Sequence, residues 1–227
     1  MHAIVVAAGS SRRMGFDKLR APLAGRPVLW HSIHALARCP EVEALTVVTR
    51  RDFFEEVRLL ADSAALGKAL VLVEGGSERY LSVSAGLATL GEEGFVAVHD
   101  AARPLVTPEV VAGCLALARL HGAASCASPV ADTVKRADGG KMVAGSVDRT
   151  GLWAMQTPQI FSNRLIREAY AAVLRDGALV TDEVSAVEHL GRPVALYENG
   201  DWNLKITFPR DIGLAELVLA SRVGRSE

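Results

Sequence analysis

Strand-like apolar runs alternate with helical stretches along most of this chain, and that alternation constrains its fold more than any other feature. Short apolar runs closed by glycine or polar residues are typical of strands buried on both faces of a sheet. Such runs occupy residues 3–8, 44–49, 69–73 and 95–99. Helical stretches follow them at residues 28–39, 52–64, from 77 or 78, and 107–121. The pattern predicts a Rossmann-like α/β fold with a doubly wound, mostly parallel sheet.

Residues 132–149 interrupt this alternation. Two β-prone runs surround Asp138-Gly139-Gly140, a combination typical of a hairpin turn. Such a hairpin carries little apolar surface and needs support from elsewhere. We therefore predict one nucleotidyltransferase-like domain over residues 1–227 with an inserted β-arm at about 132–149. Beyond the arm we expect strands at 156–161, 194–197 and 203–207, and helices at 163–174, 181–190 and 209–222.

Composition narrows the class of protein. A net charge of −1 gives no overall basic field, so we expect no nucleic-acid partner. The three cysteines, Cys39, Cys114 and Cys126, show no C-x-x-C spacing and are interpreted as buried free thiols in a reducing compartment. No leader pattern opens the chain, and no apolar run approaches the length of a membrane span. We expect a cytoplasmic protein without a membrane partner.

The loop after the first strand points to phosphate chemistry. Small residues (Ala7, Ala8, Gly9 and Ser10) expose backbone N–H groups at the carboxyl edge of the predicted sheet, where open α/β folds bind ligands. Arg12, Arg13 and Lys18 add positive charge, which suits a polyphosphate. The loop matches neither a Walker A motif nor G-x-G-x-x-G, and a solvated surface turn is the competing interpretation. Its pattern resembles the signature loop of nucleotidyltransferases and leaves the substrate open.

Polar residues also follow other predicted strands. The glycines before Arg79 permit close approach to a base or ribose, and Ser82 lies one turn into the next helix. Asp100, with Arg103 close behind it, suits a Mg²⁺ ion or ribose hydroxyls, whereas a turn or capping aspartate is the alternative. Lys205 lies in an expected strand, where a solvated edge lysine is the ordinary interpretation.

Several motifs together resemble one family, the 2-C-methyl-D-erythritol 4-phosphate cytidylyltransferases of the non-mevalonate isoprenoid pathway. They cover nearly the whole chain in the order of that family, although the chain departs from the usual family loop at Ser11 and at 17–19. The motifs lie at residues 7–18, 75–79, 98–104, 132–136, 147–153, 156–159, 181–183 and 203–207.

The resemblance implies transfer of CMP from CTP to 2-C-methyl-D-erythritol 4-phosphate, with one Mg²⁺ ion held at Asp100. Catalytic roles fall on Arg13, Lys18 and Lys205. Nucleotide binding is implied for Ala7, Ala8, Gly9, Ser10, Gly76, Ser82, Asp100 and Ala101. Acceptor binding is implied for Arg103, Thr133, Arg149, Thr157 and Thr181.

The arm also predicts a homodimer. A poorly self-supporting hairpin that carries Thr133 and Arg149 is most simply explained if a second copy of the chain supports it, so that each arm completes the other copy's site. A hairpin folded back on its own cleft is the alternative.

Three other functions remain open. The nearest is a cytidylyltransferase for another polyol phosphate, such as ribitol 5-phosphate. A nicotinamide-dependent oxidoreductase would also use a first-strand phosphate loop, but the missing G-x-G-x-x-G weighs against it. A non-catalytic nucleotide sensor would keep the loop without needing Lys205 or the arm residues.

Overall fold

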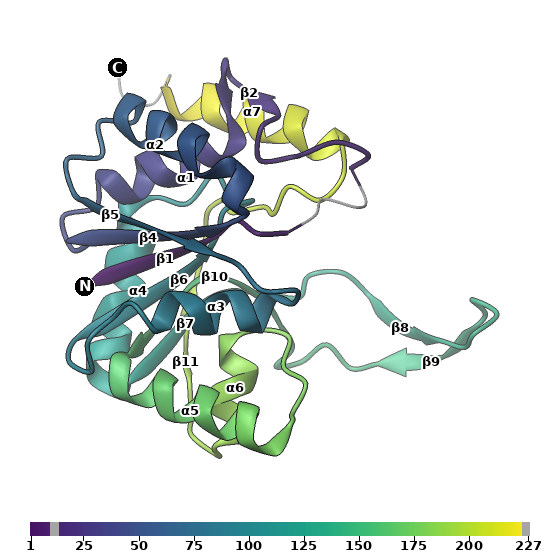
Figure 1. Cartoon of the computed structure of the whole chain (residues 1–227). Helices are drawn as coiled ribbons and strands as arrows, with labels where there is room; N and C mark the ends of the chain where they lie inside the picture. Colours follow the sequence, from purple (N-terminus) through teal and green to yellow (C-terminus); the bar gives the residue numbers. More distant parts are fainter. Residues whose placement is uncertain (10–13, 224–227) are drawn as a thin grey trace.

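The computed structural model describes residues 1–9 and 14–223, and a seven-stranded sheet forms its centre (Figure 1). The strand order is β11-β7-β10-β6-β1-β4-β5. The strands are β1 (His2–Val6), β4 (Ala44–Thr49), β5 (Ala69–Glu74), β6 (Phe95–Asp100), β7 (Ala123–Pro129), β10 (Trp153–Ser162) and β11 (Ala195–Glu198).

Parallel pairing dominates this sheet. β1 pairs in parallel with β4 and β6, β4 with β5, and β11 with β7, whereas β10 runs antiparallel between β6 and β7. The predicted mostly parallel α/β sheet is therefore confirmed. The carboxyl ends of β1, β4, β5 and β6 share one edge, where such folds place their ligands.

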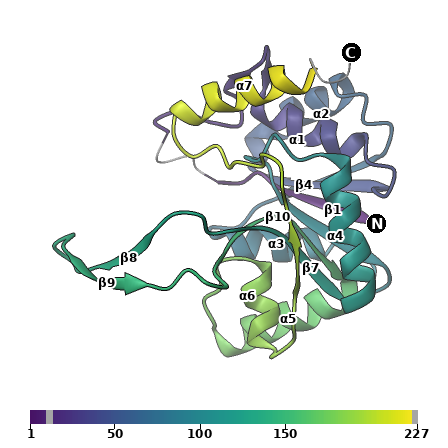
Figure 2. The same ribbon diagram turned by 180° about the vertical axis from the view of Figure 1, so that it is seen from behind.

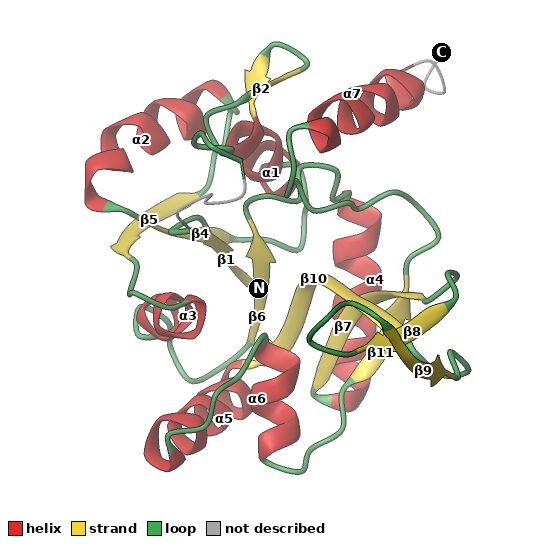
Figure 3. Cartoon of the chain, turned by 90° about the vertical axis from the view of Figure 1, so that its right-hand side faces the viewer, coloured by secondary structure: helices red, strands yellow, loops and turns green. Residues whose placement is uncertain are grey.

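Helices cover both faces of the sheet because successive strand side chains point to opposite sides. One core contains Val5 of β1 and apolar residues of α1 (Val28–Ala37), α2 (Phe54–Ser63), α4 (Pro108–His121) and α7 (Arg210–Val223). The other contains Ile4 and apolar residues of α3 (Arg79–Leu87), α5 (Asn163–Asp176) and α6 (Glu183–His189). Figure 3 shows the helices above and below the strands. No helix within the described ranges combines the length and the hydrophobicity needed to cross a bilayer.

The small elements complete the chain. A 3-10 turn, η1 (Arg51–Phe53), precedes α2, and β2 (Pro22–Leu23) pairs with β3 (Arg26–Pro27). Thr107 caps α4, with Pro108 in its first turn; the Thr107 hydroxyl oxygen accepts from the Val110 backbone N–H.

The arm is the hairpin of β8 (Val134–Ala137) and β9 (Val143–Val147), and it extends away from the body (Figures 1 and 2). Asp138 Oδ1 accepts from the backbone N–H groups of Gly140 and Met142, which fixes the tip. No residue of β8 or β9 is buried in the single chain. The predicted hairpin is confirmed, and its lack of a core of its own agrees with its low apolar content.

Two sequence predictions for strands were wrong or incomplete. Residues 203–207 form no strand; Ile206 N–H donates instead to the Ala102 carbonyl, and Thr207 N–H donates to the Asp211 carboxylate. This segment therefore lacks the ladder of a neighbouring strand. Conversely, β7 was not predicted, because its alanine and serine residues have little strand preference.

One close packing contact gives a test of this fold. A Cβ added at Gly113 of α4 would overlap the ring of Tyr197 in β11, whereas at Gly213 of α7 it would meet no atom within 4 Å. Alanine raises helix stability over glycine by roughly 0.5–1 kcal/mol. We expect Gly213→Ala to raise the free energy of unfolding and Gly113→Ala to lower it by about 1–3 kcal/mol, because of overpacking. Urea denaturation measures both, and equal stabilisation by the two variants would contradict the close approach of α4 to β11.

Candidate active site

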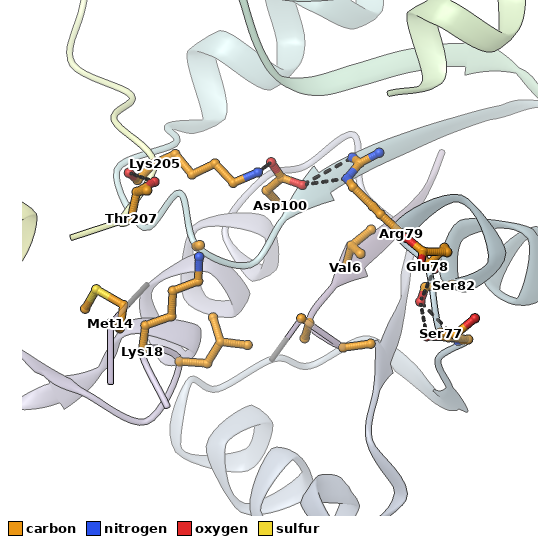
Figure 4. A pocket seen from close by; sticks show the side chains of 16 residues that line it. Val6, Met14, Lys18, Ser77, Glu78, Arg79, Ser82, Asp100, Lys205 and Thr207 are labelled. Carbon is orange, nitrogen blue, oxygen red and sulfur yellow. Dashed lines mark hydrogen bonds and ion pairs between the residues drawn. The ribbon is translucent and has the colours of Figure 1, made fainter. Parts of the chain in front are cut away.

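A cleft of about 640 Å³ opens at the carboxyl ends of β1, β5 and β6 (Figure 4). Four separate segments of the chain line it: the first loop, the loop before α3, the end of β6, and the segment before α7. The lining residues are Val6, Ala7, Ala8, Gly9, Met14, Lys18, Leu19, Gly76, Ser77, Glu78, Arg79, Ser82, Asp100, Ala102, Lys205 and Thr207.

Eight residues predicted for the site line this cleft together. They are Ala7, Ala8, Gly9, Lys18, Gly76, Ser82, Asp100 and Lys205. Ser10 and Arg13 lie outside the described residues.

Gly75, directly after β5, allows the loop before α3 to lie close to the first loop. A Cβ on Gly75 would overlap Ala8 and crowd the Ser82 hydroxyl. Ser82 Oγ accepts from the Gly76 backbone N–H at 3.1 Å and is 1% exposed. Close approach of these two loops therefore requires a residue without a side chain at position 75.

Asp100 at the end of β6 is the charged centre of the cleft, and its side chain contacts three cations among the residues that the structure describes. Lys205 Nζ lies 2.7 Å from Oδ2, the Arg79 guanidinium 3.2 Å from Oδ1, and Arg103 Nε 3.8 Å from Oδ2. Burial alone would raise the pKa of the Asp100 carboxyl, but Arg79, Lys205 and Arg103 outweigh it and hold that pKa well below its usual range. Figure 4 shows Lys205 and Arg79 approaching the carboxylate from opposite sides. Asp100 is therefore ionised throughout the ordinary pH range.

Arg79 connects this carboxylate to a second one, and its role was missed from the sequence. Its guanidinium forms two hydrogen bonds to Glu183, at 2.7 and 2.9 Å, and Glu183 is fully buried at the start of α6. Tyr170 also donates to Glu183, at 2.9 Å. A bidentate ion pair of this kind fixes the orientation of the Arg79 guanidinium. The only sequence signal was its place directly after Gly75-Gly76-Ser77-Glu78.

Lys18 approaches the same cleft from the first loop. Its ammonium donates to the Ile206 carbonyl at 2.9 Å, next to Lys205 in the chain. Two lysines from opposite ends of the sequence therefore line one cavity. This arrangement brings positive charge to a polyphosphate-sized space.

Three predicted site residues lie behind the cleft rather than in its lining. Ala101 is fully buried, and its N–H donates to Val6 O at 3.1 Å. Arg103 donates to the carbonyls of Asn203 and Met155. Thr157 is 3% exposed, and its hydroxyl contacts Asp100 N–H and the imidazole of His99. Burial lowers the pKa of His99 to about 4, so its ring is neutral near pH 7.

The remaining acceptor candidates do not meet the cleft within one chain. Thr133 and Arg149 are exposed at the base of the arm, and Arg149 donates to the Ala131 carbonyl. Thr181 is exposed ahead of α6, where its hydroxyl contacts Ser185. None of the three belongs to the cleft lining described above.

The carboxylates of the cleft suit a metal ion that binds together with the phosphates of a substrate. Among the described residues, no cluster of three or more His, Cys, Asp or Glu side chains is able to hold a metal. Asp100 nevertheless supplies a carboxylate in the cleft wall. Mg²⁺ is commonly held by one or two carboxylates together with substrate phosphates. The single carboxylate of Asp100 is thus compatible with a Mg²⁺ ion that substrate phosphates mainly coordinate.

Comparison with known proteins places the chain in a family. The family model described as 2-C-methyl-D-erythritol 4-phosphate cytidylyltransferase matches residues 1–221. A protein of that name from Symbiobacterium thermophilum is 42% identical over 219 residues, covering 95% of this chain and 91% of the relative. One from Prochlorococcus marinus is 40% identical over 226 residues, covering 98% and 99%.

A solved structure agrees with these sequence relatives. The crystal structure of 2-C-methyl-D-erythritol 4-phosphate cytidylyltransferase from Thermus thermophilus is similar with a TM-score of 0.78 and 31% identity, covering 97% of this chain and all of the other. Sequence and fold thus agree over nearly the full length of the chain. The chain belongs to the 2-C-methyl-D-erythritol 4-phosphate cytidylyltransferase family.

Proposed function

We propose that the protein transfers CMP from CTP to 2-C-methyl-D-erythritol 4-phosphate, which yields 4-diphosphocytidyl-2-C-methyl-D-erythritol and pyrophosphate. Membership of the family supports this reaction. One structural observation carries the proposal: Lys18, Lys205 and Asp100, which is ion-paired with Lys205, line the same nucleotide-sized cleft. The oxidoreductase and nucleotide-sensor alternatives gain nothing from that arrangement.

The chemistry requires no base from the protein. An oxygen of the acceptor phosphate bonds to the α-phosphorus of CTP. The bond between that phosphorus and the oxygen bridging it to the β-phosphate breaks, and pyrophosphate leaves with the electron pair of this bond. A phosphate monoester has a second pKa of about 6, so the nucleophile is already mostly dianionic near pH 7. The protein's task is to position two anions and to neutralise the charge that develops.

The described residues divide these tasks among themselves. Lys18 and Lys205 neutralise the phosphates of CTP, while Ala7, Ala8, Gly9, Gly76 and Ser82 surround the nucleotide. Arg13 is proposed for the polyphosphate from its sequence motif alone. When bound at Asp100, Mg²⁺ would polarise phosphate oxygens and neutralise part of their charge.

The acceptor half of the site is proposed to come from a second copy of the chain. Thr133 and Arg149 are exposed on the arm and lie outside the cleft lining. Met142 and Val143, near the tip, are 69% and 70% exposed, an apolar surface suited to contact with a partner. We therefore propose a homodimer in which each arm completes the other copy's cleft.

We also propose that residues 1–227 form one domain, which the shared sheet supports. A cytoplasmic location is proposed as well, and the three free thiols support it.

The reaction is tested by measuring pyrophosphate release from CTP with two acceptors. We expect release with 2-C-methyl-D-erythritol 4-phosphate and formation of the diphosphocytidyl product by mass spectrometry. Ribitol 5-phosphate, which presents the same kind of phosphate on another polyol, should support much slower release. Equal or faster turnover with ribitol 5-phosphate would contradict the proposed acceptor.

Shared sites are tested by mixing two inactive variants. We expect Lys18→Ala and Arg149→Ala each to abolish most turnover, because one removes a charge from the cleft and the other removes a charge from the arm. Random reassembly at equal amounts makes about half the dimers mixed, and each mixed dimer has one intact site if the arm acts in trans, so about a quarter of all sites should recover. Native mass spectrometry confirms that mixed dimers are present. Background turnover in such a sample would show that the arm acts on its own chain.

A further inference from the structure

His99 is a buried side chain next to Asp100 to which no role has so far been given. It is fully buried at the end of β6. Its Nε2 lies 3.1 Å from the carbonyl oxygen of Arg103, and its Nδ1 lies 3.0 Å from the hydroxyl of Thr157. Because a carbonyl only accepts, Nε2 carries the ring hydrogen, and in the neutral ring Nδ1 is left as an acceptor.

Thr157 extends this contact to the backbone of Asp100. Its oxygen accepts from the Asp100 N–H at 3.0 Å. The hydroxyl hydrogen of Thr157 is then available for Nδ1 of His99. The imidazole is thus connected to both ends of the turn over residues 100–103: through Thr157 to the Asp100 N–H, and directly to the Arg103 carbonyl.

This turn carries the geometry of the charged centre. It is closed by a hydrogen bond from Arg103 N–H to the Asp100 carbonyl at 3.0 Å. Between its ends, the Ala102 carbonyl accepts from Ile206 N–H at 2.8 Å, which anchors the residue next to Lys205. Both partners of the Asp100–Lys205 ion pair therefore depend on one turn of backbone.

We propose that His99 and Thr157 are a positioning pair that fixes Asp100 and the Lys205 segment for the transfer reaction. The proposal rests on the proposed function and gives Thr157 a role other than contact with the acceptor, in agreement with its place outside the cleft lining. Neither side chain belongs to the cleft lining. The pair acts by holding the turn over residues 100–103 in place. This matters for the rate because small misplacements of reacting groups slow a reaction by large factors.

The test compares Thr157→Val, which keeps the shape and removes the hydroxyl, with Thr157→Ser, which keeps the hydroxyl and removes a methyl group. We expect Thr157→Val to lower kcat by roughly 10- to 100-fold, with the KM for each substrate changed by less than about 3-fold. Thr157→Ser should retain kcat near that of the unaltered protein even if its Tm falls. His99→Leu should resemble Thr157→Val, and the double variant should be no slower than the slower single variant, because both remove one linkage.

A matched control comes from the opposite side of the fold. Asn163 is 5% exposed, and its amide donates to the carbonyls of Gly91 and Glu93. Asn163→Leu should lower the Tm while leaving kcat unchanged, because it breaks buried hydrogen bonds outside the cleft. It shows how much of any rate loss follows from lower stability alone.

Three results would overturn the positioning role. One is a folded Thr157→Val variant with unchanged kcat, and another is an equal loss of kcat in Thr157→Val and Thr157→Ser. A rise confined to the KM for the acceptor would place Thr157 in the acceptor site instead. Where His99→Leu does not fold, the two Thr157 variants decide the matter. Failure of the proposed function itself is distinguishable, since the unaltered protein would then form no product.

Discussion

The ion pairs of Asp100 are the interaction on which the cleft depends. A carboxylate buried at the end of a strand would be costly in isolation, and protonation would be its ordinary outcome. Here Lys205, Arg79 and Arg103 compensate for that burial and keep the group charged. Removal of a single cation would leave part of the Asp100 charge buried without a partner. Such a variant would be less stable than a protein with no charged group at this position.

The same contacts join regions that are distant in the sequence. Asp100 is linked to Lys205 near the C-terminus and, through Arg79, to Glu183 at the start of α6. Lys18 reaches the Lys205 segment through the Ile206 carbonyl. One charged centre therefore orients the first loop, the loop before α3, the end of β6 and the segment before α7. Such convergence at the carboxyl edge of a sheet is how open α/β folds assemble a site from separate loops.

Local patterns were enough to predict much of this arrangement. Ala7, Gly9, Gly76 and Asp100 were identified because each follows an apolar strand, and the carboxyl ends of parallel strands meet at one edge. The sheet itself followed from the alternation of strand-like and helical segments. Strand β7 escaped prediction because its small residues lack the β-branched character typical of buried strands.

Long-range contacts account for what local patterns could not reveal. The role of Arg79 depends on Glu183, a residue distant in the chain, and no local spacing reveals that pair. Lys205 was placed in a strand, whereas the structure holds it in an irregular segment attached to the turn after β6. Packing turns the Thr157 hydroxyl toward the backbone of Asp100, a contact that its local motif does not reveal.

A double-mutant cycle on turnover tests most directly whether Asp100 and Lys205 act as one unit. Asp100→Asn and Lys205→Met each remove one charge of the pair, and each should lower kcat by about 100-fold or more. If the two charges work together, the double variant is about as slow as the slower single variant. Asp176→Asn, at an exposed carboxylate paired with Arg175, serves as the control and should leave kcat unchanged. Losses that multiply in the double variant, or a folded Asp100→Asn variant with normal turnover, would contradict the account.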